Sequence, residues 1–372
     1  MNETTEIINN TKQYIKEKYN IKEEDMNITL EKIDGMTNKN YHISFSIKNE
    51  PNKTFDILYR KYGEVLDSLT HDSEIFIMNY LSNKKEGPKV LFKCKEYRIV
   101  EYIKNSSIIP LELRYDQKIL YDIYVILSKY SQISNMFTYS ISSDLKFNIF
   151  NNKNTFQTIF DMNENMFDKA KKNYEIFSQK FAEHFDSIEN NLKQIKKKYD
   201  FYMKDYKNFF ISLFPKKGFF ILSHNDCQRW NFLYLEDKQL MIIDHEYACL
   251  SLPGIDICNY MNENSFYFYD DGRYEFKKNE INFEFYYQQY LNYLNEFIKL
   301  YSKDEHENEN FFKEIKTKKY YINLHCINNI FWFLFNVINL NFENEIIKKS
   351  EHFFEYGYDR LCYYELAHDY LN

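Results

Sequence analysis

The period of the hydrophobic pattern changes near residue 103, and this change constrains the fold more than any other feature of the sequence. Short segments of alternating apolar and polar residues dominate before it, and apolar residues spaced by three or four dominate after it. The first period is typical of β-strands and the second of helices. We therefore expect an α+β fold with a sheet-rich region over residues 1–103 and a mostly helical region over residues 104–372.

The sheet-rich region is expected to begin with an amphipathic helix over residues 1–20. The strands that we predict after it cover Asn27–Lys32, Tyr41–Ile47, Phe55–Tyr59, Val90–Cys94 and Tyr97–Tyr102, with one helix over Ser73–Leu81. Successive short strands of this kind are typical of an antiparallel sheet. The order β-β-β-α-β-β therefore predicts one antiparallel sheet with a single helix.

The helical region contains an apolar stripe that repeats every three or four residues from Phe177 to Leu213. This stripe predicts one long helix, or two in series, packed against a core. Further helices are expected from about Ile255 and Phe283. The most apolar segment, Ile330–Leu340, is about half as long as a membrane span and contains asparagines. It predicts a buried helix, and we expect no membrane span.

Charge and cysteine content exclude several classes of function. The net charge is −7, which argues against a broad basic surface and a nucleic-acid partner. None of the six cysteines forms a C-x-x-C pair, and His and Cys never cluster at zinc-ligand spacing. The N-terminal segment is polar and lacks the apolar core of a secretory signal. We therefore expect free thiols and a cytoplasmic location.

The residues that point to a reaction lie between positions 221 and 248. An apolar strand ends at Ser223, and the loop after it contains His224 and Asp226. Asn231 follows five residues after Asp226, and Asp244 ends the second strand of a predicted hairpin. Phosphoryl transfer from ATP needs one carboxylate to accept the hydroxyl proton, and a carboxamide and a second carboxylate to hold Mg²⁺. A structural His–Asp pair in a turn is the alternative.

Three segments resemble the choline/ethanolamine kinase family. They read SHNDCQRWN from Ser223, IDHEYA from Ile243 and PGIDICNYMNE from Pro253. The resemblance extends over about residues 30–365 and is strongest from 223 to 263. It implies a protein-kinase-like two-lobed fold, ATP and Mg²⁺ as cofactors, and homodimers as a common assembly. Its implied roles are catalytic base for Asp226 and metal binding for Asn231, Asp244 and Gln228, with Glu246 supporting the metal shell.

The resemblance also implies a nucleotide site in the sheet-rich lobe. A phosphate-covering turn would lie between the first two strands, a cation at the end of the third strand would reach the phosphates, and a glutamate on the next helix would pair with it. An inter-lobe hinge would meet the adenine through its backbone. The residues at these places are Gly35, Thr37, Asn38, Arg60, Glu74, Glu101 and Ile103. Taken singly, a simple turn would also explain Gly35, and a surface charge would also explain Arg60 or Glu74.

The implied substrate is choline or ethanolamine. In the resembling choline kinases, a carboxylate and several aromatic rings surround the ammonium, and rings attract a quaternary ammonium through cation–π interactions. The matching residues are Glu263, Tyr267 (or Phe268 beside it), Trp332 and Phe335, with Phe353 or Tyr356 in the place of a late tyrosine. Helix packing alone would also explain Trp332 and Phe335.

Three positions depart from the family pattern and leave this aromatic pocket incomplete. Phe335 stands in place of a second tryptophan, Asn264 in place of another, and His245 in place of a phenylalanine. We predict a choline kinase that makes phosphocholine for phosphatidylcholine synthesis. An ethanolamine kinase, a kinase of the same architecture such as an aminoglycoside phosphotransferase, and a non-catalytic nucleotide-binding module are the alternatives.

Overall fold

A computed structural model describes residues 3–33, 38–48, 50–63, 68–134, 136–141, 147–149, 156–184, 188–236, 239–269, 274–301, 305–340 and 347–371. The chain forms two compact units. The first unit contains Met1–Ser107 and Tyr234–Glu246, and the second contains Ile108–Leu233 and Tyr247–Asn372. The chain thus first crosses between units at Ser107, and the predicted division into lobes at residues 103 and 104 stays a prediction.

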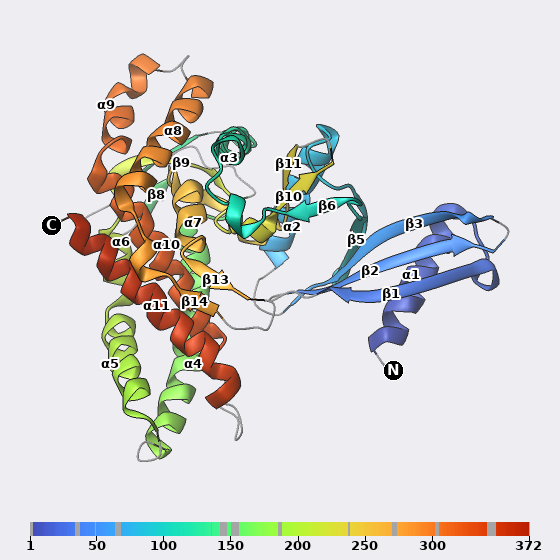
Figure 1. Ribbon diagram of the computed structural model, residues 1–372, viewed down its shortest axis with the longest axis horizontal. Coiled ribbons are helices and arrows are strands. Elements are labelled where there is room, and N and C mark those ends of the chain that lie inside the picture. Colours follow the sequence, from blue (N-terminus) through green and yellow to red (C-terminus); the bar gives the residue numbers. More distant parts are fainter. Residues whose placement is uncertain are drawn as a thin grey trace. The chain divides into compact units, whose positions relative to one another are not determined.

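The first unit is built on a five-stranded antiparallel sheet in the order β1-β2-β3-β5-β4 (Figure 1). Its elements are α1 (Glu3–Tyr19), β1 (Met26–Ile33), β2 (Lys39–Ile47), β3 (Glu50–Lys61), α2 (Ser68–Asn83), β4 (Val90–Lys93) and β5 (Tyr97–Glu101). The predicted β-β-β-α-β-β order after an N-terminal helix is therefore confirmed. The strong alternation of apolar residues in these strands explains why this part was predictable.

The two faces of this sheet have different roles. Apolar residues on one face pack with α1 into a core that includes Ile7, Ile15, Ile43 and Ile57. Side chains alternate between faces along a strand, so the opposite face carries polar residues beside apolar ones such as Leu58 and Val100. On that face Arg60 of β3 lies opposite Arg98 of β5, and Ser44 of β2 lies opposite Asp56 of β3. The sheet register thus places Arg98 beside Arg60 on this face.

A second, smaller sheet has the order β11-β10-β6, and most of its residues belong to the first unit. Its strands are β6 (Ser106–Ile108), β10 (Phe232–Leu235) and β11 (Leu240–Ile242). Strands β10 and β11 lie next to each other, as the hairpin prediction required. Asp244 lies two residues after the end of β11 and has a φ angle of 66°, in the left-handed region that aspartate tolerates better than most residues.

The second unit is mostly helical. Its helices are α3 (Gln117–Ser131), α4 (Ile159–Glu183), α5 (Asn190–Lys204), α6 (Tyr206–Ser212), α7 (Ile255–Glu263), α8 (Phe283–Tyr301), α9 (Glu305–Ile315), α10 (Lys318–Ile338) and α11 (Ile347–Leu371). Helix α10 is buried along almost its whole length, and α11 packs along it (Figure 1). The predicted buried helix near residue 330 is thus confirmed. Within the described residues, no helix is long and apolar enough to cross a membrane.

The expectation of one or two helices over Phe177–Leu213 is wrong. The stripe from Phe177 to Leu213 belongs to three helices, α4, α5 and α6, because the chain leaves helical geometry after α4 and again at Asp205, where φ is −127°. The apolar spacing continues across both breaks, since all three helices bury tyrosine or phenylalanine side chains. Periodicity alone therefore could not reveal the breaks.

The region after residue 103 also contains strands that the helical period hid. A four-stranded sheet has the order β12-β9-β7-β8, with β12 (Cys249–Ser251), β9 (Lys217–Ser223), β7 (Phe137–Ile141) and β8 (Phe147–Ile149). A two-stranded sheet pairs β13 (Phe266–Phe268) with β14 (Tyr274–Phe276). Of the strands in these two sheets, only β9 was predicted, because the others are three to five residues long, too short for alternation to stand out.

Candidate active site

The loop that contains Asp226 begins where β9 ends. Asn225 has a φ angle of 61°, and asparagine is one of the few residues that adopt this left-handed conformation readily. Its side-chain Nδ2 donates hydrogen bonds to the carbonyl oxygens of Ser223 at 3.2 Å and Tyr247 at 3.1 Å. These bonds fix the turn that leads into Asp226, and they join this loop to the segment before β12.

Helix α7 holds the same loop through its first turn. The carboxylate of Asp256 accepts the backbone N–H of His224 at 2.9 Å and that of Asn225 at 2.8 Å. One turn later, Oδ1 of Asn259 accepts the backbone N–H of Cys227. Residues three apart lie on one face of a helix, so α7 presents both acceptors to the loop together. The sequence pattern contained both residues, but their role in holding the loop was not predicted.

Burial raises the pKa of the Asp256 carboxyl from 3.8 to about 6, although the N–H groups of His224 and Asn225 oppose this shift. The folded protein thus holds this proton more tightly than the unfolded chain does. Its contribution to stability is complete below pH 3.8 and is lost as the pH rises through about 6.

Asp256→Asn should therefore flatten the pH dependence of stability. Between pH 4 and pH 7, the free energy of unfolding of the original protein should fall by about 2 kcal/mol relative to that of the variant. Urea unfolding at a series of pH values measures this difference. Parallel curves for the two proteins would show that Asp256 does not titrate in this range.

The loop brings three predicted site residues together. Nδ2 of Asn231 donates to Oδ2 and to the backbone oxygen of Asp226, each at 2.8 Å, and Nε2 of Gln228 donates to the same Oδ2 at 3.2 Å. The side chains of Asp226 and Asn231 are buried. Because the amide nitrogen of Asn231 is committed to Asp226, its carbonyl oxygen is directed away as a potential ligand. Oxygen atoms of this kind suit Mg²⁺.

A second group of predicted residues lies in the first unit, around Arg60. Its Nη2 contacts Oδ1 of Asp244 at 2.5 Å and Oε2 of Glu246 at 3.3 Å. Asn38 donates to Glu246 and accepts the backbone N–H of Gly63 at 3.0 Å. Burial lowers the pKa of Arg60, but Asp244, Glu74 and Glu246 raise it by a larger amount. The pKa therefore lies above its usual value, and the guanidinium stays charged. The unit therefore joins a predicted phosphate-binding cation to a predicted metal-binding carboxylate.

Glu74 has a second partner that the sequence did not reveal. Arg98 donates to both carboxylate oxygens of Glu74, whereas Nη1 of Arg60 lies 3.7 Å from Oε1 of Glu74. Burial raises the pKa of Glu74, but the two guanidinium groups lower it more, to about 2. Glu74 thus orients two cations, and Arg98 takes the closer pairing.

Arg98→Met should destabilise the protein strongly. It removes the closest partner of a carboxylate that is 2% exposed, and breaking a buried pair in this way costs about 3–5 kcal/mol. Lys93→Met, which breaks an exposed pair with Asp72 in the same unit, should cost at most about 1 kcal/mol. Urea unfolding compares the two variants, and similar small losses would contradict a structural role for the Arg98–Glu74 pair.

The structure describes only some of the remaining residues that are predicted to bind the nucleotide. Gly35 and Thr37 lie outside the described residues. The backbone N–H of Glu101 donates to the carbonyl of Lys89 at 2.9 Å, and the carbonyl of Ile103 accepts the hydroxyl of Ser106 at 3.0 Å. The predicted hinge is therefore anchored at both ends, and its role toward adenine stays a prediction.

Two predicted pocket residues, Trp332 and Phe335, lie on one face of α10 and meet Tyr247. The ring centroid of Tyr247 is 5.0 Å from that of Trp332 and 6.2 Å from that of Phe335, and the latter two are 5.3 Å apart. Nε1 of Trp332 is buried and finds no acceptor among the described residues. We call these three rings the aromatic cluster. Tyr247 was known from the sequence only as part of the motif.

Glu263 lies one turn after Asn259 on α7 and pairs with an arginine. Nη2 of Arg360, on α11, donates to Oε1 of Glu263 at 2.6 Å, and the hydroxyl of Tyr356 donates to Oε2 at 3.3 Å. Asn259 donates to Oε1 at 3.3 Å. The same residue therefore contacts both the loop that carries Asp226 and the predicted ammonium-binding carboxylate.

Tyr267 forms hydrogen bonds with residues outside the predicted ammonium pocket. Its hydroxyl donates to Oε2 of Glu280 at 2.6 Å and accepts a hydrogen bond from Arg114. Its neighbour Phe268 packs against Tyr356, with the ring centroids 5.6 Å apart. Because strand side chains alternate, Phe268 and Tyr267 point to opposite faces of β13. The geometry thus groups Phe268, rather than Tyr267, with Glu263.

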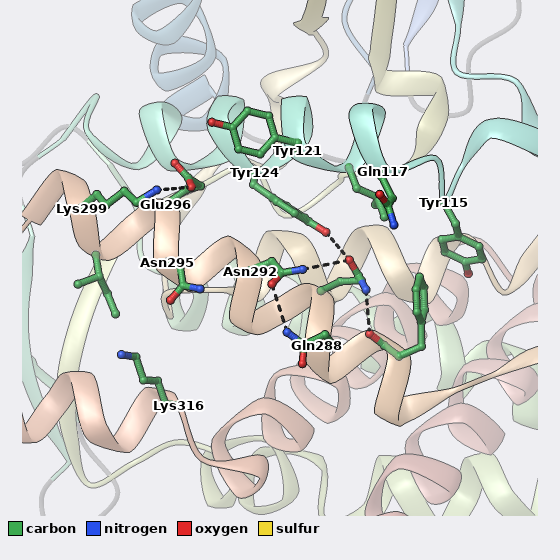
Figure 2. A pocket seen from close by; sticks show the side chains of 14 residues that line it. Tyr115, Gln117, Tyr121, Tyr124, Gln288, Asn292, Asn295, Glu296, Lys299 and Lys316 are labelled. Atoms are coloured by element: carbon green, nitrogen blue, oxygen red, sulfur yellow. Dashed lines mark hydrogen bonds and ion pairs between the residues drawn. The ribbon is translucent and has the colours of Figure 1, made fainter.

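A groove on the second unit is lined by a different set of residues. It runs between α3 and α8, and Figure 2 shows carboxamide and tyrosine side chains along it. Tyr124 donates to Gln289 at 2.8 Å, and Gln288 donates to Asn292 at 3.2 Å. None of the predicted site residues lines it. Within the described residues, no group of three or more His, Cys, Asp or Glu side chains could hold a metal ion.

Comparison with solved structures identifies the class of fold. A choline kinase from Cryptosporidium parvum has a TM-score of 0.62 at 20% identity, covering 99% of this chain and 96% of that one. An ethanolamine kinase from Plasmodium vivax has a TM-score of 0.54 at 16% identity, covering 95% of this chain and 86% of that one. Both are similar in fold, and the expected protein-kinase-like fold is confirmed. A search of curated protein sequences finds no match.

The sequence comparison identifies the family. The model of the choline/ethanolamine kinase family matches residues 30–365, which is most of the chain. The chain therefore belongs to the choline/ethanolamine kinase family, as the motifs around Asp226 and Asp244 indicated.

Proposed function

We propose that this protein is an ATP- and Mg²⁺-dependent choline kinase, which transfers the γ-phosphate of ATP to the hydroxyl of choline. The observation that carries this proposal is the hydrogen bond from Asn225 to the carbonyl of Tyr247. This bond joins the loop that contains Asp226 to a residue of the aromatic cluster. The proposed base is thereby linked to the rings that we propose to bind a quaternary ammonium. The product, phosphocholine, would serve phosphatidylcholine synthesis.

The catalytic role that we assign to Asp226 is to accept the proton of the choline hydroxyl. Its carboxylate is held by Asn231 and Gln228, and a positioned carboxylate is the usual base for a hydroxyl nucleophile in kinases. The carbonyl oxygen of Asn231 and the carboxylate of Asp244, with Gln228, would hold Mg²⁺. When bound, the ion would neutralise the charge of the phosphates.

The nucleotide would be held by the first unit. Arg60 would contact the phosphates, and Glu74 and Glu246 orient its guanidinium. The turn that contains Gly35, Thr37 and Asn38 would cover the phosphates, and the hinge at Glu101 and Ile103 would meet the adenine. The family to which the chain belongs supports this arrangement.

Choline is preferred to ethanolamine in this proposal because of the rings. A quaternary ammonium has no N–H to satisfy, and each aromatic face contributes about 0.5–2 kcal/mol to its binding. Tyr247, Trp332 and Phe335 would offer such faces, since their three rings lie together with centroids 5.0, 5.3 and 6.2 Å apart. A primary ammonium needs hydrogen-bond acceptors instead, and it would depend mainly on Glu263.

Release of ADP from Mg²⁺–ATP, measured with choline and with ethanolamine at matched concentrations, tests this proposal. A clear preference for choline is expected. A preference for ethanolamine would assign the same reaction to the other amino alcohol. If neither substrate raised the release of ADP above the background rate, this result would contradict an amino-alcohol kinase.

A further inference from the structure

Arg360 is a charged side chain that the sequence did not single out, and it contacts two residues of the predicted ammonium pocket, Glu263 and Tyr356. It is 1% exposed. Its guanidinium carbon lies 4.3 Å from the ring centroid of Phe266 and 4.8 Å from that of Tyr356. Its Nη2 donates to Oε1 of Glu263 at 2.6 Å and to the hydroxyl of Tyr356. Aromatic faces and a carboxylate thus surround a cation that belongs to the protein.

Both oxygen atoms of Glu263 are occupied by these contacts. Oε1 accepts from Arg360 and from Asn259, and Oε2 accepts from the hydroxyl of Tyr356. The side chain of Glu263 is only 8% exposed, so water contributes little to its solvation. A substrate ammonium that approaches Glu263 therefore meets a carboxylate whose charge and lone pairs are already engaged.

We infer that Arg360 is a specificity-determining residue, which neutralises Glu263 and thereby favours choline over ethanolamine. This inference rests on the proposed kinase function. Arg360 would act through Glu263 and would not touch the reacting atoms, so it is a positioning residue. No sequence motif described above contains Arg360, and the inferred role follows from contacts between α7 and α11.

The preference follows from the different needs of the two ammonium groups. The primary ammonium of ethanolamine loses its hydrogen bonds to water on binding, and burial without acceptors is costly. The trimethylammonium of choline has no N–H to satisfy and interacts with ring faces. With Glu263 engaged by Arg360, the rings of the aromatic cluster remain as the main attraction, and they favour choline.

Arg360→Met tests the inference, because it removes the charged partner of Glu263 and leaves Asn259 as the only donor to Oε1 among the contacts described above. The ratio of kcat/KM for choline to that for ethanolamine should fall at least about tenfold, the scale of one hydrogen bond to a charged group. The KM for ATP should stay unchanged. Arg360→Lys keeps the positive charge and should restore most of the ratio. A ratio within about twofold of the original in a folded Arg360→Met protein would overturn the inference.

A milder variant guards against misfolding of Arg360→Met. Tyr356→Phe keeps the ring but removes the hydroxyl that donates to Oε2, so the ratio should shift in the same direction by about threefold. An unchanged or opposite shift would count against the inference. Lys198→Met removes a different cation that pairs with α11, through Glu365 at 2.6 Å, and it should leave the ratio unchanged.

The original protein separates this inference from the proposed function. If it phosphorylates neither amino alcohol, the proposed function fails, and the role of Arg360 falls with it. If it phosphorylates one or both and the variants lower choline and ethanolamine turnover in parallel, only the role of Arg360 is overturned. A selective change in the ratio supports both.

Discussion

Asp226→Ala is expected to lower kcat for phosphorylation of the amino alcohol by a factor of about 10²–10⁴, the usual contribution of a general base. The KM for ATP should change little, because Asp226 would contact the hydroxyl rather than the nucleotide. Asn231 still donates to the backbone oxygen of residue 226 after this change, so the loop should keep its conformation. Steady-state kinetics and a thermal melt of the same sample provide the comparison.

Two further variants make this experiment decisive. Asp226→Asn keeps the shape of the side chain and an oxygen that accepts from Asn231, and it should lose almost as much activity as Asp226→Ala. Asp168→Asn changes an exposed carboxylate on α4 and should leave kcat unchanged. Near-normal activity in Asp226→Asn would contradict the role of Asp226 as the base.

Asp244→Asn is expected to lower kcat/KM by about 100-fold or more, with a higher Mg²⁺ concentration needed for half-maximal rate. The neutral amide is a weaker ligand for the cation than the carboxylate, although it keeps an oxygen. Arg60 retains Glu246 and Glu74 as partners, so the first unit should remain folded. Titration of the rate with Mg²⁺ at fixed ATP measures the shift.

A matched control distinguishes metal binding from a structural role. Asp72→Asn removes an exposed carboxylate of α2 in the same unit and should leave the Mg²⁺ dependence unaltered. If Asp244→Asn instead lowered the melting temperature while its remaining activity had the original Mg²⁺ dependence, Asp244 would act through its ion pair with Arg60.

Local features made much of this protein predictable. The antiparallel sheet of the first unit follows from strict alternation, which has a physical cause in the opposite directions of successive side chains. The grouping of Asp226, Gln228 and Asn231 follows from their closeness in the chain, since a loop of five residues cannot separate them far. Family membership then extended these local signals to residues 30–365.

Contacts between distant segments were not predictable in the same way. Arg98 pairs with a glutamate 24 residues away, and Arg360 pairs with one 97 residues away. Neither the spacing nor the composition around these arginines indicates a partner. Tyr247 was hidden by the abundance of aromatic residues, which makes any single ring uninformative. The breaks between α4, α5 and α6 were hidden because apolar spacing continued across them.

Direct detection of the product tests the central claim, transfer of a phosphoryl group to an amino-alcohol hydroxyl. Incubation with Mg²⁺–ATP and choline, followed by phosphorus NMR, should show a phosphomonoester of choline in equal amount to ADP, and Asp226→Asn should show neither. Formation of ADP with inorganic phosphate alone, or the absence of any phosphorylated product with choline and with ethanolamine, would contradict it.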